Sequence, residues 1–244
     1  MKKALNLLTL VTALAGGSFA LTAAQAQSQT PASTPSLQPS AASAPAPTAS
    51  PRAADKLIAM CIGCHNIIGY QASFPEVHKV PMIAGQGAKY IVSALQAYKK
   101  GDRKHPTMRS IAASLSDQDM NDIAAYYEQL GKKADGAAPP DNLAVQSGAD
   151  VQALLTKGGC VSCHGANLSK PLDPSYPKIA GQHADYLYVA LKAYQTEHNP
   201  LVGRANPIMG AQARQFSHAE LRKLADYIGS LPGEVRTVPE SRFR

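Results

Sequence analysis

The pattern Cys-x-x-Cys-His occurs twice in this chain and uses all four of its cysteines. The pattern is the covalent attachment signature of c-type haem. Its two thiols lie on one helical turn, so each can form a thioether with a haem vinyl group, and the adjacent imidazole can ligate the iron. The sequence therefore predicts two covalent haems c, attached through Cys61, Cys64, Cys160 and Cys163, with His65 and His164 as iron ligands.

Other uses of paired cysteines fit the chain less well. A redox dithiol followed by a chance histidine would look like one copy of the pattern, but the second copy argues against chance. Two disulfides are the alternative for an exported protein. Zinc ribbons place their cysteine pairs about 15 to 20 residues apart, whereas Cys61 and Cys160 are 99 residues apart.

The chain begins with a targeting signal. Lys2 and Lys3 precede an apolar run from Leu5 to Leu21, and small residues follow at Ala24–Ala26. This order predicts a secretory signal peptide over residues 1–26 and export of the mature protein, with an uncleaved anchor as the alternative. No later apolar run approaches the length that spans a bilayer.

Composition sets the next segment apart and excludes one class of partner. Residues 27–52 are rich in Pro, Ala and Ser, which cannot bury a core, and are expected to form a disordered tether. The whole chain carries a formal net charge of +7. Its basic residues are scattered and no recognition motif accompanies them, so we expect no nucleic-acid partner.

A repeat divides the remaining chain into two domains. The segment Pro-x-Ile-Ala-Gly-Gln begins at Pro81 and again, 96 residues later, at Pro177. A period near 100 residues is too long for a solenoid and indicates two duplicated domains. We expect these domains at residues 53–135 and 148–244, joined by a linker over residues 136–147.

Each domain is expected to be all-α and wrapped around one haem, since no convincing alternating strand pattern appears. Apolar spacing predicts a helix that leads into each haem motif, a second helix with a tyrosine-bearing face, and a last helix that starts at a serine cap. The second helices are expected around Tyr90–Tyr98, with Gly101 as the stop, and around Tyr186–Tyr194. The last helices are expected to start after Ser116 and Ser217 and to end at Gly131 and Leu231–Gly233.

Two methionines in matched positions are the candidates for the second iron ligand. Met108 and Met209 each follow a proline by two residues, and they lie 43 and 45 residues after the motif histidines. A thioether is a soft, neutral ligand that raises the reduction potential. Both could instead be core methionines, and a bis-histidine centre in one domain is a further alternative. No other methionine or histidine recurs at a matching place, so Met108 and Met209 are preferred.

The repeat also suggests what orients the motif histidines. A metal-bound histidine usually donates its other ring N–H to a backbone carbonyl or carboxylate. The segments around Pro81 and Pro177 are the candidates for these carbonyls, although both prolines could simply be turn residues.

Together, the paired haem motifs, the Pro-x-Ile-Ala-Gly-Gln segments and the Pro-x-Met segments resemble the dihaem cytochrome c4 family over residues 53–235. The resemblance implies two tandem class I cytochrome c domains with His/Met ligation at both irons and no catalytic site. It implies a periplasmic shuttle in a respiratory chain, which takes electrons from a quinol-linked complex or dehydrogenase to a terminal oxidase and associates peripherally with the inner membrane. Arg103 and Arg204 resemble basic residues near haem propionates in such domains.

The first copy departs from that pattern. Asn66 follows its motif where Gly165 follows the second, and the loop to Pro81 is 16 residues long, against 13 in the second copy. Two other functions stay open: a cytochrome subunit of a periplasmic dehydrogenase complex, and a dihaem enzyme of the peroxidase or thiosulfate-oxidising type. The enzyme needs an iron with an open site, against which the matched methionines argue.

Overall fold

The computed structural model describes residues 57–133 and 147–240, called the first and second half below. The predicted signal peptide (1–26), the tether (27–52) and all of the linker except Ser147 lie outside these residues. No helix in the two described ranges is long and apolar enough to cross a membrane.

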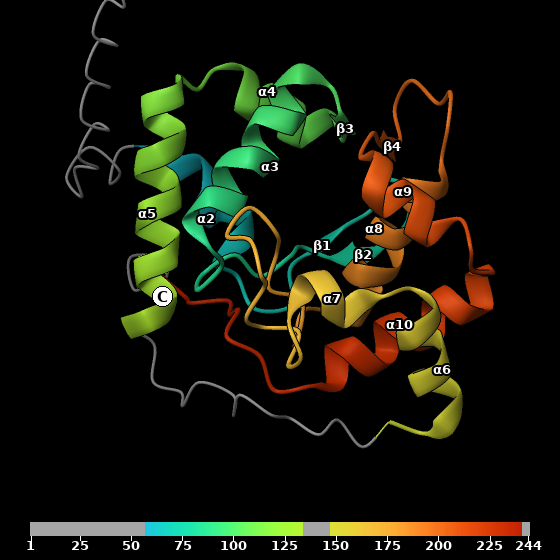
Figure 1. Cartoon of the computed structure of the whole chain (residues 1–244). Helices are drawn as coiled ribbons and strands as arrows, with labels where there is room; N and C mark the ends of the chain where they lie inside the picture. Colours follow the sequence, from blue (N-terminus) through green and yellow to red (C-terminus); the bar gives the residue numbers. More distant parts are fainter. Residues whose placement is uncertain (1–56, 134–146, 241–244) are drawn as a thin grey trace, which may run out of the picture. The chain divides into compact units, whose positions relative to one another are not determined.

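Among the described residues, the helices α2 to α5 of the first half recur in the same order as α7 to α10 of the second half, which α6 precedes (Figure 1). The first half contains α2 (Ala59–His65), β1 (Gln71–Ala72), β2 (His78–Lys79), α3 (Ala88–Lys100), β3 (Arg103–Lys104), α4 (Pro106–Ala113) and α5 (Asp117–Lys133). The second half contains α6 (Ala149–Lys157), α7 (Cys160–His164), α8 (Ala184–Gln195), β4 (Gly203–Arg204), α9 (Pro207–Ala213) and α10 (His218–Ser230). The predicted helical fold is confirmed, with the addition of strands of two residues each.

The predicted helix starts and stops are mostly confirmed. The helix α3 ends at Gly101, whose φ of 87° is the left-handed conformation that glycine adopts most easily. Ser217 and Glu220 form the predicted capping box of α10, each side chain accepting the backbone N–H of the other residue. Ser116 and Asp119 make the same reciprocal bonds at the start of α5, at 3.1 and 2.8 Å.

Two expectations about helices were wrong. The helix leading into the second motif is broken: α6 ends at Lys157 and α7 starts at Cys160, because Gly158 and Gly159 intervene and Gly159 has a φ of 56°. Gly131 does not end α5, which continues to Lys133. Gly131 instead allows the backbone of α5 to pack closely against the backbone of Gly85, because a Cβ on Gly131 would lie 2.0 Å from the backbone nitrogen of Gly85.

This contact predicts whether an alanine at position 131 of α5 raises or lowers the free energy of unfolding. Alanine favours a helix over glycine by about 1 kcal/mol, but a methyl group at Gly131 would collide with backbone that cannot rotate away. We expect Gly131→Ala to lower the free energy of unfolding by about 1–3 kcal/mol, measured by denaturant titration. Gly87→Ala is the control, since its new Cβ would meet nothing closer than 3.5 Å; equal costs would contradict the argument.

Each half has its own hydrophobic core. In the first half, α3 packs against α4 and α5, and the buried side chains include Ile91, Leu95 and Tyr127. In the second half, α10 packs against α8 and α6, around Leu187 and Leu224. The duplicated sequence therefore folds as two similar helical halves. Each half has its own core, to which its own motif helix contributes.

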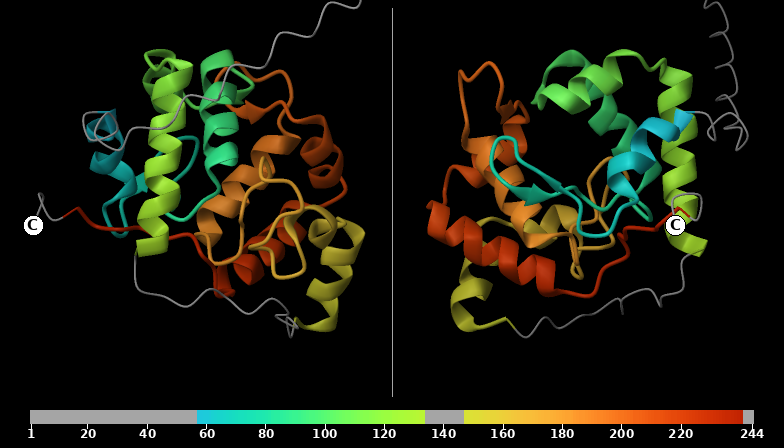
Figure 2. Two further views of the ribbon diagram at one scale, coloured as in Figure 1. Left: turned by 60° about the vertical axis from the view of Figure 1, so that its left-hand side comes forward. Right: turned by 180° about the vertical axis from the view of Figure 1, so that it is seen from behind.

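A short antiparallel ribbon joins the halves. Arg103 of β3 pairs with Arg204 of β4, and Lys104 pairs with Gly203. The longer loop of the first half also reaches the second, where β2 contacts α8 (Figure 2). Lys192 of α8 donates to both carboxylate oxygens of Glu76, at 2.9 and 3.0 Å. The three additional residues of this loop thus belong to a segment that packs against the other half.

Two buried glutamines pair the halves reciprocally. Gln86 donates to the carbonyl of Lys178 at 2.9 Å and accepts its N–H at 2.9 Å. Gln182 makes the same two bonds with the backbone of Met82, at 2.8 and 3.0 Å. The two side chains are 3% and 5% exposed, so water does not replace these bonds. The glutamines of the repeated segment therefore hold the halves together around an approximate twofold axis.

Removing one glutamine should weaken the interface. Gln182→Ala leaves the N–H and carbonyl of Met82 without partners. An unsatisfied buried group costs about 1–3 kcal/mol, so we expect a loss of that size in denaturant unfolding and a similar loss for Gln86→Ala. Gln215→Ala is the control, because Gln215 is exposed and bonds only within its own turn. An unchanged midpoint in both interface variants would contradict the assigned role.

Candidate functional site

Both haem motifs lie on short helices against the core of their half. Cys61, Cys64 and His65 occupy α2, and Cys61 packs against the first core. Met108 of α4 packs against that same core, so the fold brings Cys61 and Met108 to one cluster. In the second half, Cys160, Cys163 and His164 occupy α7, and Cys160 packs against the second core. Met209 lies half-buried in α9, outside that cluster.

The motif histidines are oriented alike in both halves. His65 Nδ1 lies 2.8 Å from the carbonyl oxygen of Pro81, and His164 Nδ1 lies 2.9 Å from that of Pro177. These are the hydrogen bonds predicted from the repeat. With Nδ1 donating to a carbonyl, the lone pair of Nε2 is available to a metal. Burial lowers the pKa of both histidines although the bonds to proline oppose it, which favours the neutral ring that binds metals.

The candidate methionines also occupy matching positions. Each lies in the first turn of a helix that begins with proline. The backbone N–H of Met108 points to Nδ1 of His105 at 3.4 Å, and that of Met209 to Oδ1 of Asn206 at 2.9 Å. The sequence analysis missed these two capping residues. The signal was a polar residue directly before a proline that opens a helix.

The competing methionines have other environments. Met120 is fully buried in the first core, whereas Met60 is exposed on the motif helix α2. Met82 lies beside Pro81, with its backbone bound by Gln182. None of the three has a counterpart in the second half, so these environments leave Met108 and Met209 as the matched pair.

No disulfide joins any of the four cysteines, all of which lie in the described part of the chain. Burial, with a smaller contribution from Cys64, raises the pKa of Cys61 to about 11, and burial also raises the pKa of Cys160. Redox-active Cys-x-x-Cys pairs have the opposite property, a lowered pKa that keeps one thiolate ready to react. The electrostatics of the motif therefore disfavour a dithiol oxidoreductase.

A cluster of arginines and tyrosines lies where the halves join. Arg103 donates to the hydroxyl of Tyr90 at 3.0 Å, and Arg204 donates to that of Tyr186 at 3.0 Å. Each guanidinium also lies over two tyrosine rings of its own half, at 5.2–5.7 Å from their centroids: Tyr90 and Tyr98 in one half, Tyr186 and Tyr194 in the other. The tyrosines recur at one offset in the sequence, a signal read there only as helix packing.

The two arginines of this cluster bear on whether the site could hold haem. Two arginines at directly paired positions repel each other, and neither forms an ion pair with a carboxylate among the described residues. Like charges held close together at a partly buried site destabilise it unless an anion nearby compensates them. A haem carries two propionate carboxylates, so the cluster fits haem, as do the paired thiols, the oriented histidines and the matched methionines.

Within residues 57–133 and 147–240, no three side chains of His, Cys, Asp or Glu gather as metal ligands. A structural zinc site needs four such ligands. The paired cysteines of each motif are therefore not part of a larger cluster of zinc-binding side chains.

Comparisons with known proteins agree with this geometry. The sequence-family model of cytochrome c matches residues 51–131 and 148–232. Cytochrome c4 of Azotobacter vinelandii is 30% identical over 190 residues, which cover 71% of this chain and 85% of that protein. A thiosulfate dehydrogenase electron acceptor of Stutzerimonas stutzeri (strain A1501) is 32% identical over 184 residues, which cover 70% of this chain and 78% of that protein. The crystal structure of reduced recombinant cytochrome c4 from Pseudomonas stutzeri superposes with a TM-score of 0.54 and 26% identity, covering 76% of this chain and 100% of that one.

Proposed function

Because this chain belongs to the dihaem cytochrome c4 family, we propose a specific set of haem-binding residues for its two haems c. Each haem supplies an iron that exchanges one electron between its ferrous and ferric states. The covalent attachment residues are Cys61 and Cys64 for the first haem, and Cys160 and Cys163 for the second. The axial pairs are His65 with Met108, and His164 with Met209. The observation that carries this assignment is the matched hydrogen bond from each motif histidine to a proline carbonyl.

The protein's own residues tune these sites. The bonds to Pro81 and Pro177 fix the ring orientation and make each imidazole a better donor. The methionine thioethers favour the ferrous state and raise the potential. The paired guanidinium groups of Arg103 and Arg204 would provide a counter-charge for haem propionates. With both axial pairs bound, neither iron would have an open position for a substrate, which would suit electron transfer.

The proposed role is a periplasmic electron carrier in a respiratory chain. It would accept electrons from a quinol-linked complex or a dehydrogenase and pass them towards a terminal oxidase. The signal-peptide pattern of residues 1–26 supports export, and the likeness to cytochromes c4 supports the carrier role. A second candidate role is to accept electrons from a thiosulfate dehydrogenase, which the name of a 32% identical relative supports.

Optical spectra test the haem assignment. The exported protein is expected to give two haems c per chain in a pyridine haemochrome assay. Its oxidised form should show a near-infrared sulfur-to-iron band scaled to two methionine ligands. One haem with that band and one high-spin haem would mean an open iron site and would favour the enzyme. No haem would overturn the assignment.

Electron donors and acceptors test the role. The reduced protein, mixed with membranes that contain a terminal oxidase, should be reoxidised at a rate that rises with its concentration and stops with cyanide. The oxidised protein, mixed with thiosulfate and a thiosulfate dehydrogenase, distinguishes the second candidate. Rapid reduction there would assign thiosulfate dehydrogenase as a donor, and reduction only by a quinol-linked complex would exclude it.

A further inference from the structure

The last described residues of the second half lie against the first half. After α10 the chain continues as an extended segment, residues 233–240, which we call the strap (Figures 1 and 2). Its Arg236 N–H donates to the carbonyl of Ala84 at 2.9 Å, as an isolated antiparallel bridge. Val238 packs against the core of the first half. The strap is therefore a part of the second half that completes the first.

Strap contacts flank His65 on both sides. Asn66, the residue after His65, donates from Nδ2 to the carbonyl of Val238 at 2.8 Å. On the other side, the carbonyl of Pro81 accepts from His65, and the strap bonds to Ala84 only three residues further along the chain. The strap therefore holds both segments that determine how His65 is placed.

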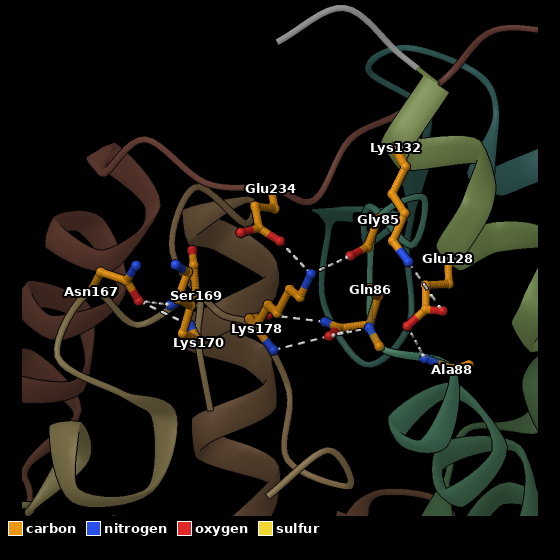
Figure 3. Close-up of polar contacts among 11 residues, drawn as sticks. Gly85, Gln86, Ala88, Glu128, Lys132, Asn167, Ser169, Lys170, Lys178 and Glu234 are labelled. Carbon is orange, nitrogen blue, oxygen red and sulfur yellow. Dashed lines mark hydrogen bonds and ion pairs between the residues drawn. The ribbon is translucent and has the colours of Figure 1, made fainter. Parts of the chain in front are cut away.

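A charged contact fastens the start of the strap (Figure 3). Lys178 forms an ion pair with Glu234 and also donates to the carbonyl of Gly85 at 3.0 Å. The ion pair is mostly shielded, with side chains 18% and 22% exposed. Gly85 leaves no room for a side chain here, since an added Cβ would lie 2.3 Å from the carbonyl oxygen of Glu234.

Asn66 explains why the first motif departs from the second. In the second half the residue after the histidine is Gly165, with a φ of 84° and a neighbouring carbonyl of Lys170 where a Cβ would be. Asn66 has a φ of −105°, which admits a side chain. That side chain is 4% exposed and also accepts a hydrogen bond from the buried hydroxyl of Tyr127 at 2.9 Å. Asn66 thus links the strap to α5 at the position next to His65.

We propose that the strap is a positioning element for the first haem site, acting through Asn66 on His65. The inference rests on the proposed assignment of His65 as an iron ligand. Asn66, which is bound to the strap, is only 4% exposed, so the strap helps to shield the residue next to His65 from water. Exclusion of water from a haem site disfavours the more highly charged ferric state and so raises the potential. The corresponding residue of the second half, Gly165, has no side chain for such a contact.

The test compares three forms of the full haem protein with the natural chain. One form ends at Pro232 and lacks the strap. The second carries Asn66→Gly, the residue of the other half, and the third combines both changes. The control ends at Glu240 and keeps every contact named above. Both reduction potentials are measured by spectroelectrochemical titration, and hydrogen exchange is followed for residues 81–86.

We expect the first-site potential to fall in the strapless form and in Asn66→Gly, with little further fall when they are combined. The second-site potential and the control should not move. The variant Met209→His should lower the potential of the second site only, so its titration shows which of the two steps belongs to that site. Exchange at residues 81–86 should accelerate on the order of tenfold without the strap.

Two results would overturn the inference. The first is a two-haem protein in which neither Asn66→Gly nor the strapless form changes the first-site potential. The second is an equal shift at both sites, which would indicate general loosening. Asn66→Gly keeps the test decisive if the strapless chain does not fold, since it removes the side chain next to His65 and leaves the strap's bond to Ala84 and its ion pair with Lys178 in place. A natural chain without haem would instead overturn the proposed function, and this inference with it.

Discussion

Replacing Cys160 and Cys163 together with alanine is expected to reduce the covalent haem content from two per chain to one. The thioethers of the second haem have no other thiols to form on, because the remaining two cysteines belong to the first motif. The second half should also lose much of its stability, since Cys160 packs against its core. A pyridine haemochrome assay after acidic acetone extraction, which removes haem that is not covalently bound, gives the count.

The matched control is Ser162→Ala, an exposed residue inside the same motif. It should retain two haems, and the pair Cys61→Ala with Cys64→Ala should retain one, held by the second half. Two covalent haems in the Cys160/Cys163 variant would show that the second motif is not an attachment site.

Replacing Met209 with histidine is expected to lower the potential of the second site. A neutral imidazole donates more strongly than a thioether and favours the ferric state. Axial ligands tune haem potentials over a range of about 0.8 V, so we expect a fall of at least about 0.1 V at one of the two sites. The near-infrared sulfur-to-iron band should fall by half, while the haem content stays at two.

Met108→His should do the same at the first site, and the double variant should lose the band entirely. Met120→Leu is the control, because Met120 is a fully buried core residue with a different environment. If Met209→His left both potentials and the band unchanged, Met209 would not be a ligand. A histidine would then be the next candidate, and the bis-histidine alternative would return.

Local signals in the sequence were sufficient for much of the fold. The repeat, the tyrosine-bearing helices and the serine caps predicted α3, α8 and the start of α10, because these depend on residues a few positions apart. The hydrogen bonds from the motif histidines to Pro81 and Pro177 were predicted from metal-site chemistry combined with the repeat. The eight haem-binding residues and the domain limits stay predictions, which the experiments above test.

Contacts between distant residues explain what was missed. Gly131 looks like a helix stop in sequence, but its close partner Gly85 lies in another segment. The glutamines of the repeated segment gave no local sign that each would bind the other half's backbone. The strap follows the helix stop at Leu231–Gly233, where periodicity ends and local patterns say nothing about tertiary contacts. Gly158 and Gly159 were a local signal for the break between α6 and α7, and they were overlooked.

The ribbon of β3 and β4 has a consequence for how the molecule assembles. The two strands lie about 100 residues apart in sequence, so neither has its partner until both halves have formed. Pairing over such a separation closes a long loop and is slow compared with helix formation. We therefore expect the docking of one half on the other to be a late step of folding, and a second half that folds slowly would leave β3 of the first without its partner strand and open to association between chains.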